Sequence, residues 1–198
     1  MGTQEYYEKH GQRLLQEYQQ ADMSKLHKLL ETYIPPHSKV LDIGFGAMRE
    51  LTYLHSLGHD IWGVDATELF IFHAQQSFPE IKEHFLQANL PFKKPLHLPN
   101  DFNAVISIAL WMHLKKEQYE DAIKDITSHL DPNKGVIVLS FSKGSRSAAD
   151  ERYFEEVDTE YLDRLLQQYG LHLIERITTE DSLKRDTLSW ITLVYRHD

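Results

Sequence analysis

The feature that constrains the fold most is the segment VLDIGFGAMRE at residues 40–50. Its apolar beginning predicts a short strand that carries Asp42, and the strand opens directly into a turn containing Gly44 and Gly46. Glycines allow tight turns and let the backbone approach a ligand closely. Because residues 47–57 have a helical pattern, we expect a strand, a glycine turn and a helix whose N-terminus faces a polar ligand.

Strands and helices alternate along the rest of the chain. We expect strands at residues 39–43, 60–65, 84–87, 102–108 and 136–141, and a closing pair at 171–178 and 187–195. We expect helices at residues 4–20, 23–33, 47–57, 67–78, 115–130 and 158–169. This alternation predicts an α/β fold with a doubly wound sheet.

Length, charge and composition narrow the function. A chain of 198 residues without a linker predicts a single domain, residues 1–198. Lys plus Arg is 21 and Asp plus Glu is 30, so the net charge is −9 and we expect no nucleic-acid partner. The absence of cysteine excludes disulfides, thiolate nucleophiles and iron–sulfur clusters. The first twenty residues are polar, so we expect a cytoplasmic protein without a membrane partner. The oligomeric state is not predicted.

Further polar residues follow the other expected strands. Asp65 ends the second strand, at the place where an acid binds the two hydroxyls of a ribose. The third strand leads into Asn-Leu-Pro-Phe at residues 89–92, and the fourth leads into Ala-Leu-Trp-Met-His at residues 109–113. Arg49 stands where a dinucleotide fingerprint needs a glycine, which argues against a nicotinamide cofactor.

This ordered set of motifs resembles the class I S-adenosylmethionine-dependent methyltransferases over essentially the full length of the chain. The resemblance implies a seven-stranded Rossmann-like sheet whose last strand is antiparallel, with S-adenosylmethionine lying across the ends of the first four strands. It divides the domain into an N-terminal helical lid, residues 1–34, and a Rossmann-like core, residues 38–198.

The resemblance also assigns cofactor contacts by position. It places them at Tyr7, Asp42, Gly44, Phe45, Gly46, Asp65, Ala66, Ala88, Asn89, Leu90, Ala109 and Trp111. Two positions depart from the family pattern: Met48 replaces the third glycine of the turn, and Asn89 replaces an acid on the adenine side. Trp111 has two interpretations, a wall of the site or a core aromatic. Tyr7 also has two interpretations: it closes the site, or it packs in the core.

Two residues are candidates for a catalytic role. His113 is the first candidate for a general base, although a structural histidine is the simpler interpretation, and Tyr153 is the second candidate. The residues after the fourth strand supply no metal-binding acid, so we expect no metal. The stretch 142–157, which includes Arg146, lies where a substrate would approach. The turn at 180–186 either shapes the substrate entrance or is solvated.

The resulting hypothesis is in-line transfer of a methyl group from S-adenosylmethionine to an oxygen, nitrogen or sulfur atom of a small molecule. The fourth motif lacks the Pro-Pro-aromatic element of the DNA amino-methylating enzymes, and no cysteine is present for cytosine C5 methylation. The alternative is a non-catalytic regulatory protein that binds S-adenosylmethionine or S-adenosylhomocysteine on the same fold. Methylation of a protein or a tRNA is disfavoured by the acidic charge.

Overall fold

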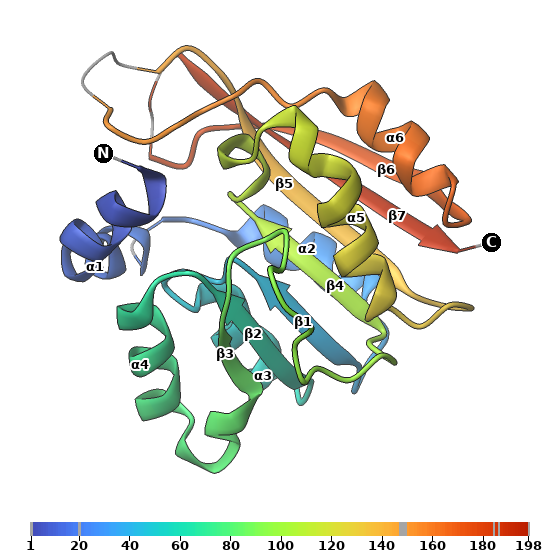
Figure 1. Ribbon diagram of the computed structural model, residues 1–198, viewed down its shortest axis with the longest axis horizontal. Coiled ribbons are helices and arrows are strands. Elements are labelled where there is room, and N and C mark those ends of the chain that lie inside the picture. The colour runs from blue at the N-terminus through green and yellow to red at the C-terminus, as the bar shows by residue number, and fades with distance from the viewer. Residues whose placement is uncertain (1, 20, 147–149, 184, 186, 198) are drawn as a thin grey trace.

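A computed structural model describes residues 2–19, 21–146, 150–183, 185 and 187–197. Its centre is a seven-stranded sheet in the order β3-β2-β1-β4-β5-β7-β6, with helices on both faces (Figure 1). Strands β1 to β5 pair in parallel, whereas β7 pairs antiparallel with both β5 and β6. The predicted doubly wound α/β fold with an antiparallel last strand is therefore confirmed.

The elements have the following bounds. The strands are β1 (Lys39–Ile43), β2 (Asp60–Asp65), β3 (Phe85–Gln87), β4 (Ala104–Ile108), β5 (Val136–Gly144), β6 (Leu171–Glu180) and β7 (Leu188–His197). The α-helices are α1 (Thr3–Gln19), α2 (Ser24–Tyr33), α3 (Arg49–Ser56), α4 (Glu68–Ser77), α5 (Tyr119–Ser128) and α6 (Thr159–Gln167). Short 3-10 helices span Pro79–His84, Trp111–His113 and Lys116–Gln118. None of these helices is long and apolar enough to cross a membrane, as far as the described residues go.

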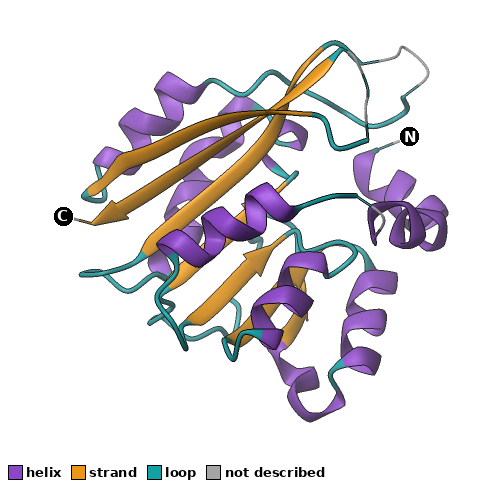
Figure 2. Ribbon diagram, turned by 180° about the vertical axis from the view of Figure 1, so that it is seen from behind, coloured by secondary structure: helices purple, strands orange, loops and turns teal. Residues whose placement is uncertain are grey.

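Helices cover both faces of the sheet, and most of the buried residues of its central strands are apolar. All five residues of β4 are buried, with Val105 in the core on the side of α5 and α6 and Ile106 in the core on the other side. Figure 2 shows the helices of this second side. Burying one large aliphatic side chain contributes ~1.5–3 kcal/mol, so these strands contribute a large share of the stability of the fold.

Several elements differ from their predicted bounds. β5 continues to Gly144 because β7 pairs with it along its whole length, and this pairing carries the strand past its apolar run to the exposed Lys143. The helix expected at 115–130 begins only at Tyr119, after two short 3-10 turns. The first helix was expected to reach residue 20, which lies outside the described residues.

The segment predicted to form the lid consists of two different parts. α2 packs on the sheet, where Leu29 and Leu30 are buried in the core. α1 lies at the edge where the parallel strands end (Figure 1). Its Gln4 amide donates to the Ala66 carbonyl at 3.2 Å, and its Glu8 carboxylate accepts from the Glu68 amide at 3.2 Å. α1 thus covers the carboxyl ends of the strands.

The turn after β1 uses three residues in the left-handed backbone region. Their φ angles are 80° at Gly44, 50° at Gly46 and 61° at Met48. Met48 precedes the first residue of α3, which explains why this helix begins at Arg49 rather than at residue 47. The Met48 side chain is 5% exposed and belongs to the core between the sheet and α2, α3 and α4. Packing therefore holds a strained residue where the family pattern has glycine.

Two substitutions separate the strain at Met48 from its packing. Met48→Ala is expected to lower the free energy of unfolding by ~2–5 kcal/mol, because it empties a buried site. Met48→Gly loses the same packing but relieves a left-handed strain of ~1–2 kcal/mol, which exceeds the extra chain entropy of glycine. Urea unfolding should therefore show the glycine variant to be the more stable of the two. A more stable alanine variant would show that Met48 is not held in the left-handed region.

Candidate cofactor and substrate cavity

A cavity of about 970 Å³ opens at the carboxyl ends of the parallel strands. This edge is where open α/β sheets bind their ligands. Its walls come from the glycine turn, the ends of β2 and β4, helix α1 and the segment between β6 and β7. Of the predicted cofactor contacts, all but one line it: Tyr7, Asp42, Gly44, Phe45, Gly46, Asp65, Ala66, Ala88, Asn89, Leu90 and Ala109.

Asp65 connects the end of β2 to the glycine turn. One carboxylate oxygen accepts from the Gly46 amide at 2.9 Å, and the other accepts from the Thr67 amide at 2.8 Å. Burial raises the pKa of this carboxyl group, while the two backbone donors oppose that rise. A carboxylate has about four lone-pair sites, so two remain for further donors such as a ribose diol.

Asp42 is a buried acid without a partner. It is 1% exposed, and neither carboxylate oxygen has a hydrogen-bond partner among the described residues. Burial raises the pKa of this group well above its usual range, and the nearby carboxyl of Glu50 raises it further. Leaving such a group unpaired is costly. Because Asp42 also lines the cavity, it fits a ligand that brings a cationic hydrogen-bond donor to this point.

The glycine turn leaves room beside these acids. A Cβ added at Gly46 would come no closer than 4.0 Å to the Gly44 carbonyl oxygen and the Phe70 ring, so it would project into open space. The Met48 side chain is absent from the cavity lining within the described chain, whereas its neighbours Ala47 and Arg49 contribute to it. The side chain of Met48, which stands in place of the third glycine, therefore points away from the cavity. These features fit S-adenosylmethionine, whose ammonium group and ribose need acidic acceptors.

Trp111 lies in the core rather than on the cavity wall. Its side chain is fully buried and packs edge-on against Tyr119, with ring centroids 5.4 Å apart. It is the predicted cofactor contact that the lining of described residues does not include. The cause is local: Ala109 adopts a φ of 65° after β4, and the following 3-10 turn brings Leu110, Met112 and His113 to the cavity instead.

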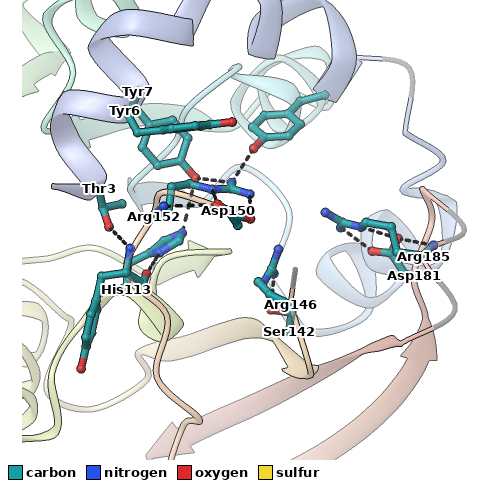
Figure 3. Close-up of polar contacts among 12 residues, drawn as sticks. Thr3, Tyr6, Tyr7, His113, Ser142, Arg146, Asp150, Arg152, Asp181 and Arg185 are labelled. Atoms are coloured by element: carbon teal, nitrogen blue, oxygen red, sulfur yellow. Dashed lines mark hydrogen bonds and ion pairs between the residues drawn. The ribbon is translucent and has the colours of Figure 1, made fainter. Parts of the chain in front are cut away.

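His113 lies beside α1, next to Tyr7 (Figure 3). Its Nδ1 is 2.7 Å from the Tyr153 carbonyl oxygen, so this nitrogen carries the proton and donates. Nε2 is then the acceptor, 3.4 Å from the Tyr7 hydroxyl. Burial, together with the charge of the neighbouring Arg152, lowers the pKa of His113 to about 4, although the hydrogen bond to the Tyr153 carbonyl opposes this change. The imidazole is therefore neutral at neutral pH, with a lone pair directed toward the cavity side of α1.

Tyr153 reaches this network only through its backbone. Its carbonyl holds His113, and its amide donates to the Thr3 hydroxyl at 2.9 Å. The side chain is 39% exposed and its hydroxyl donates to Glu155. Tyr153 thus positions His113 and joins its own segment to α1, while its phenol is not among the residues that line the cavity in the described chain.

Sequence reasoning missed Arg152. Its guanidinium donates to the hydroxyls of Tyr7 at 3.3 Å and Tyr18 at 3.2 Å, and it forms a two-point ion pair with Asp150 at 2.9 and 2.7 Å (Figure 3). It also lies over the Tyr6 ring, 5.1 Å from its centroid. Arg152 therefore fastens the stretch after β5 to α1. The only sequence signal was an acid and an arginine two residues apart in an irregular segment.

Among the described residues, no group of three or more His, Cys, Asp or Glu side chains is arranged to hold a metal ion. The expectation of no metal therefore stays a prediction.

Acidification should weaken the fold through His113. Its pKa is about 4 in the folded chain against a usual 6.5, so the unfolded chain binds a proton first. The stability that this group contributes is complete above pH 6.5 and is lost as the pH falls to about 4. Urea titrations across this range should give a shallower pH dependence for His113→Asn, with His97→Asn controlling for the loss of an exposed histidine. Equal slopes for wild type and His113→Asn would contradict the assignment.

Loss of Arg152 should release α1. Arg152→Gln removes the guanidinium that donates to the Tyr7 and Tyr18 hydroxyls, and it leaves Asp150 without its ion-pair partner. Each hydrogen bond to a charged group contributes ~1.5–3 kcal/mol. Amide hydrogen exchange in α1 is expected to accelerate at least tenfold, while exchange in β4 stays slow. Arg13→Gln, an exposed change on α1 itself, is the matched control. Unchanged exchange in Arg152→Gln would show that the helix is held by its other contacts.

Comparison with known proteins agrees with this geometry. Residues 40–133 match a family model described as a methyltransferase domain. A comparison with curated proteins found no significant sequence match.

Three solved structures show how far the fold is shared. A TehB-like methyltransferase from Corynebacterium glutamicum is 22% identical, with 96% of this chain and 98% of that chain covered and a TM-score of 0.68. 1,6-Didemethyltoxoflavin-N1-methyltransferase from Burkholderia thailandensis is 16% identical, with 98% of this chain and 87% of that chain covered and a TM-score of 0.73. Geranyl diphosphate C-methyltransferase from Streptomyces coelicolor A3(2) is 15% identical, with 88% of this chain and 76% of that chain covered and a TM-score of 0.66.

At such identities the structural likeness shows the fold. The sequence match covers the glycine turn, both acids and the strand after them. Together, the match to a methyltransferase domain over residues 40–133 and the shared fold support the resemblance of this protein to the class I S-adenosylmethionine-dependent methyltransferases.

Proposed function

We propose that this protein transfers a methyl group from S-adenosylmethionine, in line, to an oxygen, nitrogen or sulfur atom of a small molecule. The observation that carries the proposal is one continuous cavity, which runs from Asp42 and Asp65 at the glycine turn to Tyr7 and His113 beneath α1. Its volume of about 970 Å³ lies at the upper end of the range for ligand pockets. It has room for a methyl donor and a small acceptor side by side.

The acidic half of the cavity suits the cofactor. S-adenosylmethionine supplies the methyl group on a sulfonium that is already activated. Asp65 would accept from the ribose hydroxyls, and the unpartnered carboxylate of Asp42 would accept from the ammonium group. On the adenine side, the exposed Asn89 forms no hydrogen bond through its side chain within the described chain, so its amide is available. The small side chains of Ala66 and Ala88 leave space beside it.

The half beneath α1 suits the acceptor. Tyr7 and Tyr18 line it from the helix, and Arg152 holds both hydroxyls in place. Since the leaving group is already activated, the protein contributes mainly by aligning the nucleophile and by excluding water. Positioning of this kind is worth ~7–11 kcal/mol.

His113 is the proposed base. The Tyr153 carbonyl fixes the tautomer in which Nε2 can take a proton from the acceptor atom. A pKa of about 4 keeps this nitrogen free at neutral pH but makes it a weak base. It therefore suits an acceptor whose proton becomes acidic as the methyl group arrives, because proton transfer then follows bond formation. The proposal assigns proton transfer to His113 and a positioning role to the Tyr153 backbone.

The orientation of Met48 bears on the non-catalytic alternative. A side chain filling the glycine turn would have favoured a protein with an impaired cofactor site, but Met48 packs in the core. Turnover with methyl-labelled S-adenosylmethionine and a cell extract separates the candidates. Label in small metabolites supports the proposal, and label only in macromolecules contradicts the substrate class. Binding without any label would favour the regulatory protein.

Cofactor binding is tested by calorimetric titration with S-adenosylmethionine and S-adenosylhomocysteine. Asp65→Asn keeps the size of the side chain but replaces one acceptor oxygen with a donor, so affinity is expected to fall at least tenfold, or ~1.4 kcal/mol. Asp101→Asn makes the same change at an exposed residue that pairs with Lys39, the first residue of β1, and it should bind like the wild type. A thermal melt of each variant verifies folding. Equal affinity in Asp65→Asn, or no binding to the wild type, would contradict the proposed site.

A further inference from the structure

Three arginines line the acceptor half of the cavity: Arg146, Arg152 and Arg185. Two of them are neutralised by carboxylates. Arg152 pairs with Asp150 at 2.7 Å, and Arg185 pairs with Asp181 at 2.6 Å, each through two nitrogens of the guanidinium (Figure 3). The Trp190 indole also donates to Asp181 at 2.7 Å, which fixes the second pair between β6 and β7.

Arg146 has no such partner. Within the described chain it forms no ion pair, and its described contacts are with neutral groups. Its Nη2 donates to the Ser142 hydroxyl at 2.5 Å, and its guanidinium carbon lies 3.9 Å from the centroid of the Phe154 ring. A guanidinium carries five N–H donors, so the contact with Ser142 leaves donors free. Arg146 is therefore positioned by its surroundings but not neutralised by them.

This placement costs free energy in the absence of an anion. Burial lowers the pKa of Arg146, and the like charges of Arg152 and Arg185 lower it further. The positive charge of these three arginines is a local feature of the cavity, since the chain as a whole carries a net charge of −9. Two of the three guanidinium groups are ion-paired with carboxylates, and that of Arg146 has no carboxylate paired with it among the described residues. An arginine is the residue of choice for recognising an oxyanion in two-point geometry.

Building on the proposed function, we propose that the methyl acceptor is a small monocarboxylic acid whose carboxylate binds Arg146. One unpaired guanidinium matches a carboxylate, which carries one negative charge, better than a phosphate monoester, which carries nearly two. The planar carboxylate also fits the guanidinium fork. Leu110, Met112 and Trp190 line the same cavity, so the rest of the acceptor is apolar or aromatic.

The test uses matched acids and amides, which differ in charge but little in shape. The protein is first saturated with S-adenosylhomocysteine and then titrated calorimetrically with benzoate and phenylacetate, and with benzamide and phenylacetamide. The wild type is expected to bind the acids at least tenfold more tightly than the amides, and added salt should reduce this preference. Arg146→Gln should abolish the preference, and Arg146→Lys should retain part of it.

Lys143→Gln is the matched control. It removes one positive charge three residues from Arg146, at an exposed side chain that pairs with Glu156 and does not line the main cavity. Its preference for acids should equal that of the wild type. Thermal melts and affinity for S-adenosylhomocysteine verify that the Arg146 variants are folded.

Three results would overturn the inference: no preference for acids in the wild type, a preference that survives in Arg146→Gln, or tighter binding of phenyl phosphate than of benzoate. The proposed function fails separately. If S-adenosylhomocysteine does not bind, the methyltransferase proposal is refuted, and the same acid and amide titrations without it still decide whether Arg146 binds a carboxylate.

Discussion

The hydrogen bond from the Gly46 amide to the Asp65 carboxylate is the interaction on which the site depends. It joins the end of β2 to the turn after β1, so it sets the opening between the two strands where a ligand would enter. The same turn places Asp42 under the opening and sends Met48 into the core, from which α3 begins. A buried carboxylate is stable in such a place only when backbone donors or a ligand satisfy it. The cofactor half is therefore built around two acids.

The two halves of the cavity differ in the charged group that has no partner. Asp42 is the unpartnered acid at the glycine turn, and Arg146 is the arginine without an ion pair near the end of β5, among the described residues. This division suits a reaction between a cationic methyl donor and an electron-rich acceptor, because each half favours one partner and disfavours the other. α1 joins the halves, since its tyrosines contact both His113 and Arg152. A covering helix held by polar contacts can also open more easily than one packed by apolar side chains.

Local patterns explain why the sequence predicted the fold and the cofactor half. A strand, a glycine turn and an acid at the end of the next strand depend on short-range rules. The resemblance to a known family added the assigned cofactor contacts, and eleven of these twelve residues line one cavity. Trp111 is not explained by such short-range rules. The left-handed backbone at Ala109 changes which of the following side chains face the cavity. Arg152 was missed for another reason: its partners Tyr7 and Tyr18 are distant in sequence, and no periodicity links them. β5 exceeded its predicted length because strand pairing, rather than its own composition, determines its end.

The most direct test of this account is a crystal structure of the complex with S-adenosylhomocysteine. The account predicts that the ribose hydroxyls contact Asp65, that the ammonium group contacts Asp42, and that the space beneath α1 next to Arg146 stays open for an acceptor. Met48 should remain in the core. A ligand bound away from the two acids, or a Met48 side chain turned into the cavity, would contradict the central claim that this edge of the sheet is a working cofactor site.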